Sequence, residues 1–180
     1  MKTSSLNALF VTSAAVAAVA VLTSVKSSTR TTAGPTLLVA RLPARDAVVR
    51  AALSQLGNGD PKRYWDDVLP GVNVGDADWC GAGALWCLHQ AGLALAKRWK
   101  IESGFLLTPP ALPTTRQPEI GDIAYFTRNQ HHAVVVGVAP GSVLLVNFNG
   151  AGGLVSVSGI DPAQATAFFS IAPLISSANA

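Results

Sequence analysis

The sequence predicts an α+β domain in which N-terminal helices pack on one face of an antiparallel β-sheet. The chain has 180 residues, the length of one domain, and 49% of them are hydrophobic, as a compact core requires. Helical periodicity occupies the first half of the chain. Short β-branched runs, separated by Gly, Pro, Asn or Ser, occupy the second half. Helices followed by neighbouring strands are typical of this fold class.

The N-terminus predicts export. Lys2 precedes an uncharged run of Ala and Val over residues 8–25, and a polar stretch follows, which is the pattern of a signal peptide in residues 1–26. The run is also close to the roughly 20 residues that span a bilayer, so the alternative is an uncleaved membrane anchor or tether. Residues 27–43 then form a Ser/Thr- and Pro-containing linker, and the folded domain is expected over 44–176.

The charge balance gives no support to nucleic-acid binding. Lys2 and Lys26 are two of the thirteen basic residues, so only eleven remain against ten acidic ones once residues 1–26 are removed. No basic stripe is left to follow a phosphate backbone, and we expect no nucleic-acid partner and a monomeric protein.

Apolar periodicity predicts three helices. Residues 45–56 place Val and Leu on one stripe before Gly57, a short helix is expected over 63–68, and residues 79–97 form a longer helix that ends in a basic stretch. The proline-rich segment 108–122 is expected to be an irregular loop. The predicted strands are 122–126, 132–138, 142–149, 154–158 and 168–174.

Two cysteines lie on the third predicted helix. Cys80 and Cys87 are separated by about 10 Å along a helix axis, whereas a disulfide needs Cα atoms closer than about 7 Å. Cys87 lies in mid-helix among large apolar residues and is expected to be a core residue. Cys80 lies in the first turn after the expected cap Asp78, where the helix dipole favours a thiolate. Position alone leaves Cys80 as either a nucleophile or a buried structural thiol, and no metal site is expected.

A thiol nucleophile needs an imidazole base, and the chain has three histidines. His89 is on the far side of the same helix as Cys80 and cannot reach it. His131 and His132 start a predicted strand, where side chains alternate between faces, so only one of them can face the helix. His131 alternates with Ala133, Val135 and Gly137, and His132 with Val134 and Val136, and periodicity does not say which set meets the helix.

Two asparagines on the next strand are candidates for the group that orients the base. Asn147 and Asn149 share a face, and asparagine is depleted in strands. An amide oxygen that accepts a hydrogen bond from an imidazole fixes its tautomer. The alternative for Asn149 is that it forms a turn with Gly150.

These segments together resemble a known family. "DWCGAGALWCLHQAGL", "GDIAYF", "HHAVVVG" and "VNFNG" are similar to the nucleophile helix, the Gly-Asp strand, the histidine strand and the third-residue strand of the papain-like CHAP and NlpC-type peptidoglycan hydrolases, over roughly residues 45–174. The stretch before Cys80 has Trp79 in place of the Gly-Gly and aspartate pattern of the NlpC group, which makes the CHAP group the more similar one.

The resemblance implies roles for individual residues. Cys80 is the nucleophile, and the family spacing of histidine, five residues and glycine makes His131 the base, with His132 in a variable place. Asn147 matches the orienting position and Asn149 the asparagine after it, although an asparagine at 147 leaves open which of the two orients the ring.

The resemblance also implies a papain-like fold and an exported cysteine peptidase or amidase. Its substrate is peptidoglycan, cleaved in the stem peptide or at the muramoyl-alanine bond, and it needs no cofactor. Arg128 is a candidate for binding a stem-peptide carboxylate and Tyr64 for the pocket wall. The alternative function is a non-catalytic module of the same fold that binds wall peptides or a protein.

Overall fold

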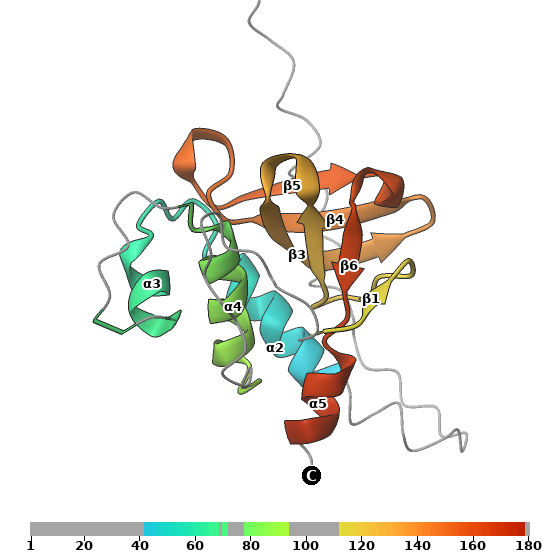
Figure 1. The fold of residues 1–180 in the computed structure, drawn as a ribbon, viewed down its shortest axis with the longest axis horizontal. Coiled ribbons are helices and arrows are strands. Elements are labelled where there is room, and N and C mark those ends of the chain that lie inside the picture. Colours follow the sequence, from blue (N-terminus) through green and yellow to red (C-terminus); the bar gives the residue numbers. More distant parts are fainter. Residues whose placement is uncertain (1–41, 69, 72–77, 94–111, 179–180) are drawn as a thin grey trace, which may run out of the picture. The chain divides into compact units, whose positions relative to one another are not determined.

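The computed structural model describes residues 42–68, 70–71, 78–93 and 112–178 (Figure 1). This part of the chain is an α+β fold with an antiparallel six-stranded sheet, as the sequence predicts. The predicted signal or anchor over 1–26, most of the linker over 27–43 and the basic end of the third helix lie outside the described residues. In the described ranges, no helix has the length and apolar character needed to cross a membrane.

Helices α2 (Leu42–Leu53), α3 (Lys62–Val68) and α4 (Cys80–Gln90) precede the sheet, and α5 (Ala172–Ala178) follows it. Helix α4 is shorter than the predicted 79–97 because Gly92 takes a left-handed conformation with φ of 72°. The amide of Leu93 then donates to the carbonyl of Leu88 at 2.9 Å, which closes the last turn. Figure 1 shows α2 and α4 beside the sheet, and both contact strand β3.

The sheet has the strand order β1-β6-β2-β3-β4-β5, and every neighbouring pair is antiparallel. Strands β2 to β5 form the predicted meander, and β6 returns to pair with the outer edge of β2. The strands are β1 (Thr114–Thr115), β2 (Ile123–Phe126), β3 (His131–Ala139), β4 (Ser142–Asn147), β5 (Ser156–Ile160) and β6 (Ala167–Phe169).

Two sequence predictions about the ends of this sheet are wrong. The segment predicted as a strand over 168–174 is a strand only to Phe169, and α5 begins at Ala172, with Pro173 in its first turn, where a missing N–H does no harm. The proline-rich segment predicted to be irregular contains β1, which is only two residues long and pairs with β6.

Both faces of the sheet are apolar, and each has its own buried cluster. The cluster on the helix side contains Val134 and Val146 together with the buried residues of α2 and α4. The cluster on the opposite side contains Ala133, Val135 and Leu145. Neighbouring residues of β3 therefore belong to different clusters, as the alternation of a strand requires.

Asp122, in the Gly-Asp pair before β2, has a structural role. Its side chain is 1% exposed, and its Oδ1 accepts from Arg45 Nη1 at 2.8 Å and from the amide of Ile171 at 3.1 Å. Its Oδ2 accepts from the amide of Glu119 at 2.9 Å. One buried carboxylate thus joins α2, the start of β2 and the segment before α5, and its charge is compensated by Arg45.

Helix α4 approaches the sheet closely at Gly83. A Cβ atom at this position would lie 2.1 Å from Cδ1 of Phe148, which follows β4. The ring of Phe148 also packs edge-on against Tyr64 and Trp79, with centroid distances of 5.3 and 6.3 Å. Glycine weakens a helix interior, so its presence in α4 is explained by this close approach.

We expect Gly83→Ala to lower the free energy of unfolding by about 1–3 kcal/mol, although alanine is the better helix former. The cause is the collision with Phe148, so the double variant Gly83→Ala/Phe148→Leu should recover part of the loss. Urea unfolding of the single and double variants measures both effects. A Gly83→Ala protein as stable as the wild type would show that α4 can move away without loss.

Candidate active site

Cys80 is the first residue of α4 and lies on the side of the helix that faces the sheet. The preceding Trp79 stacks on Tyr64, with ring centroids 5.3 Å apart and an interplanar angle of 8°, which fixes the start of the helix. Trp79 is the N-cap residue and no side chain caps the helix, so the prediction that Asp78 is the cap is wrong. Cys80 is 3% exposed, so it is also more buried than a reactive thiol at a helix end is expected to be.

His132, and not His131, is the imidazole that faces Cys80. The Sγ atom of Cys80 lies 3.9 Å from Nδ1 of His132, and the ring of His132 is fully buried. The prediction that His131 is the base of Cys80 is therefore wrong. His131 lies on the opposite face of the sheet, where its Nε2 is 3.1 Å from Oδ1 of Asn147.

A β-bulge breaks the predicted alternation that placed His131 and Gly137 on one face of the sheet. Val135 pairs with Leu145 and Gly137 with Leu144, so Val136 is an extra residue in β3. Gly137 consequently packs against Leu144, which contacts the helix-side cluster, whereas His131 belongs to the opposite face. Alternation counted back from Gly137 crosses the bulge and changes face.

Asn147 contacts His131, the histidine that it was predicted to orient, but this histidine does not face Cys80. Asn147 holds His131 through its Oδ1 and donates from Nδ2 to Oγ of Ser158 at 2.9 Å, so this hydrogen-bonded row runs across β3, β4 and β5 on the face away from Cys80. Asn149 has a φ of 53° in the turn after β4, which agrees with its alternative role as a turn residue. Its Nδ2 donates to Oδ1 of Asp78 at 2.9 Å and ties this turn to the segment before Cys80.

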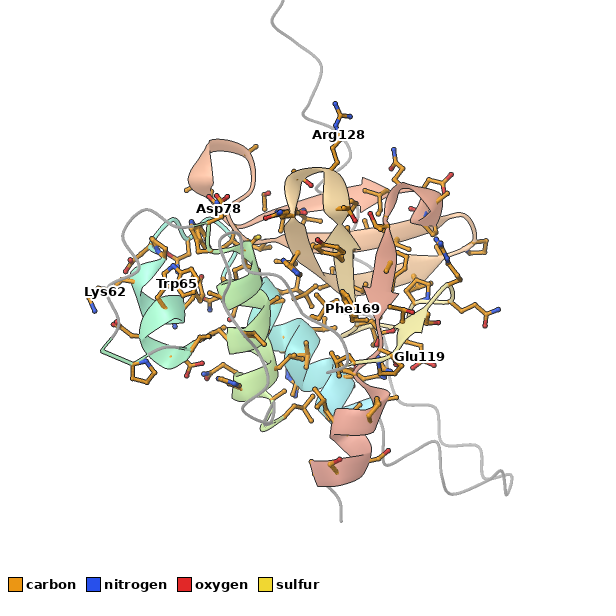
Figure 2. The ribbon with its side chains drawn as sticks, viewed as in Figure 1. Lys62, Trp65, Asp78, Glu119, Arg128 and Phe169 are labelled. Carbon is orange, nitrogen blue, oxygen red and sulfur yellow. The ribbon has the colours of Figure 1, made fainter. Side chains whose placement is uncertain are left out.

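Tyr64 differs from its predicted role, whereas the role of Arg128 stays a prediction. Tyr64 is fully buried, and its hydroxyl contacts Asn58 and Gln55, so it belongs to the core instead of an open pocket wall. Arg128 is exposed, and its side chain projects away from the body of the domain (Figure 2).

A cavity of about 440 Å³ lies next to Arg128, but it does not include the cysteine. Its lining residues are Phe126, Thr127, Arg128, Asn129, Gln164 and Thr166. Since Phe126 belongs to the cluster on the face opposite α4, this cavity is separate from the Cys80–His132 pair. Among the described residues, no group of three or more His, Cys, Asp or Glu side chains could hold a metal ion.

The environment of Cys80 keeps its thiol neutral. Burial raises the pKa of Cys80, and Asp78 raises it further, whereas hydrogen bonds from the backbone amides of His132 and Gly81 act in the opposite direction. Burial also lowers the pKa of His132 to about 3, with a contribution from the neighbouring His131. At neutral pH the pair is therefore a thiol beside a neutral imidazole, and the low pKa of His132 makes it a weaker base than an ordinary histidine in this resting state.

A second acceptor also lies close to the sulfur. The Sγ atom of Cys80 is 3.8 Å from the carbonyl oxygen of Gln130, the residue before β3. Gln130 has a φ of 50°, a conformation that residues other than glycine adopt infrequently. Its carbonyl was not foreseen from the sequence, because a backbone group leaves no residue-type signal.

The buried, neutral state of His132 predicts a pH dependence of stability. An unfolded histidine titrates near 6.5, so between about pH 3 and pH 6.5 the unfolded chain binds a proton that the folded site excludes. The stability that His132 contributes is thus complete above about pH 6.5 and is lost as the pH falls toward 3.

We therefore expect the wild type to lose stability on acidification faster than His132→Gln, which cannot titrate. Urea unfolding at a series of pH values across this window measures the difference between the two proteins. Parallel stability curves would contradict this expectation, because they would show that folding does not change the pKa of His132.

Comparison of the chain with protein-family models, curated proteins and solved structures gives no match.

Proposed function

We propose that this protein is a papain-like cysteine hydrolase that cleaves an amide bond in bacterial peptidoglycan, with Cys80 as nucleophile and His132 as base. The observation that carries the proposal is the distance of 3.9 Å between Cys80 Sγ and His132 Nδ1. The two residues come from segments 52 positions apart in the chain. A nucleophile and a base that approach within hydrogen-bonding reach, or slightly beyond it, are what thiol catalysis requires.

The reaction follows from this geometry. His132 Nδ1 takes the proton of the Cys80 thiol as Sγ attacks the amide carbon of the substrate, which gives a tetrahedral oxyanion. The imidazolium then returns the proton to the leaving nitrogen, the C–N bond breaks, and an amine departs from a thioester. In the second half, His132 takes a proton from water as the water oxygen attacks the thioester carbon. The C–S bond then breaks, the imidazolium returns the proton to Sγ, and a carboxylic acid leaves the regenerated thiol and neutral imidazole.

The start of α4 supports the stabilisation of the oxyanion. No side chain caps this helix, and the backbone amides of Cys80 and Gly81 both act on the negative charge of the thiolate. An amide already directed at the reacting centre stabilises charge that develops there, so the Cys80 amide is the proposed oxyanion donor. Because the resting pair is neutral, the nucleophile is formed only when His132 accepts the proton.

The choice of peptidoglycan rests on two features of the sequence. The first is the similarity of the cysteine helix and the histidine strand to CHAP and NlpC-type hydrolases. The second is the N-terminal pattern of an exported protein, which would bring the domain to the cell envelope. A stem-peptide bond and the muramoyl-alanine bond are both amides, and either suits the proposed chemistry.

The test is incubation of the purified protein with peptidoglycan, followed by mass analysis of the soluble fragments, beside Cys80→Ala as control. New fragments that appear only with the wild type support the proposal, and their masses identify the bond. The burial of Cys80 at 3% exposure favours the alternative of a binding module. Sedimentation with peptidoglycan in both proteins, without fragments in either, would support that module and contradict hydrolysis.

A further inference from the structure

We propose that Tyr125 is the positioning residue that holds the His132 imidazole toward Cys80, by packing its ring against the imidazole. The inference rests on the proposed role of His132. A base must present one particular nitrogen to the nucleophile, and the amide expected to do this, Asn147, holds His131 on the other face instead.

The pairing of strands places Tyr125 beside the base. Tyr125 of β2 is the direct antiparallel partner of His132 in β3. Directly opposite residues project from the same face of a sheet, so the two side chains lie next to each other. Their ring centroids are 4.9 Å apart, and the planes are inclined by 37°.

Tyr125 is itself supported from its other side. Its ring lies 6.0 Å from the ring of Phe169 in β6, at an angle of 50°. Phe169, Tyr125 and His132 thus form an aromatic row across three neighbouring strands, on the face that meets α4. Rotation of the imidazole about its χ2 angle would displace this row, so the row restricts the ring to the orientation in which Nδ1 faces Sγ.

The same contact helps to exclude water from the base. His132 is fully buried, whereas Tyr125 is half-buried and packs at the edge of the helix-side cluster. Removal of the Tyr125 ring should both loosen the imidazole and admit water to it. A residue with only a structural role would change stability without changing how His132 titrates or assists the thiol.

The test compares Tyr125→Leu with Tyr125→Phe, which retains the ring. A matched control is Phe126→Leu, because Phe126 is the next residue of β2 and packs against His131 on the opposite face, at a centroid distance of 6.0 Å. Alkylation of Cys80 by iodoacetamide, followed by peptide mass analysis, is measured near neutral pH and at strongly alkaline pH. NMR of ¹³C-labelled histidine follows the titration of His132.

We expect Tyr125→Leu to lower the ratio of the neutral to the alkaline alkylation rate by about tenfold, since a misplaced base no longer takes the thiol proton. The pKa of His132 should rise toward its ordinary value, and Tyr125→Phe should restore both properties. On peptidoglycan, kcat should fall while KM changes by less than about twofold, because Tyr125 acts through the base.

Three results would overturn the proposal: an unchanged alkylation ratio and titration in Tyr125→Leu, an equal loss in Tyr125→Phe, or an equal loss in Phe126→Leu. The alkylation and NMR measurements need no peptidoglycan. A wild type inactive on the cell wall would therefore contradict the proposed function, while these two measurements still decide whether Tyr125 positions His132.

Discussion

Replacement of His132 by glutamine is expected to lower kcat/KM on peptidoglycan by about 10²–10⁴-fold, the usual contribution of a general base. The same replacement of His131 should change kcat/KM by less than about threefold, because His131 lies on the opposite face of the sheet and contacts Asn147. The two substitutions are chemically identical and one residue apart. They differ in whether the imidazole faces Cys80 Sγ.

Steady-state hydrolysis of purified peptidoglycan by the two variants measures this difference, with circular dichroism to verify that both are folded. His131→Gln should be less stable than the wild type by about 1 kcal/mol if its hydrogen bond to Asn147 is lost. A large loss of activity in His131→Gln, with His132→Gln active, would show that His131 is the base, as the family spacing indicated. It would contradict the proposed pairing of Cys80 with His132.

Cys80→Ala is expected to lower the kcat for peptidoglycan hydrolysis by a factor on the order of 10⁴ or more, because no other described group at the site can form the thioester. Cys87→Ala should keep kcat within about twofold, although it lies on the same helix. Cys87 is fully buried, and burial raises the pKa of its thiol far above the physiological range, so it packs as a small apolar residue.

The cysteine pair also separates catalysis from stability. Cys87→Ala and Cys80→Ala should each lower the free energy of unfolding by about 1 kcal/mol through the cavity that they leave, because both thiols belong to the buried cluster on the helix side, whereas only Cys80→Ala should lose activity. Thermal unfolding of the two variants measures the change in stability, and peptidoglycan hydrolysis by the same variants measures the change in activity. Hydrolysis by Cys80→Ala at the wild-type rate would show that the Cys80 thiol is not the nucleophile.

Much of the fold follows from local patterns in the sequence. The α+β class, the antiparallel meander and the short helix α3 are confirmed, because apolar periodicity and turn residues report directly on local structure. The end of α4 was missed because the stretch from Trp79 to Lys97 contains no proline, and the left-handed conformation of Gly92 that ends the helix cannot be read from the residue type alone. The strand β1 was missed because a two-residue strand carries no periodicity.

The sequence predicts that a cysteine and a histidine meet at the site, but it does not predict which histidine pairs with Cys80. The position of Cys80 at a helix start follows from the sequence, and so does the arrival of one of two histidines opposite it. Which histidine arrives depends on which face of β3 meets α4, and the sequence does not show this because both faces are apolar and buried. The partnership of Tyr125 with His132 depends on the register between two strands, which only the assembled sheet defines.

The spacing of the two cysteines has a consequence for oxidation. Both are free thiols, and they are the only two in the chain. Their separation of seven residues on one helix prevents them from closing a disulfide. If an oxidant converts Cys80 to a sulfenic acid, Cys87 cannot resolve it, so its return to the thiol depends on a thiol from outside the chain. In an oxidising compartment, the burial of Cys80 would protect its thiol, and the reducing capacity of the surroundings would limit how long the proposed nucleophile stays reduced.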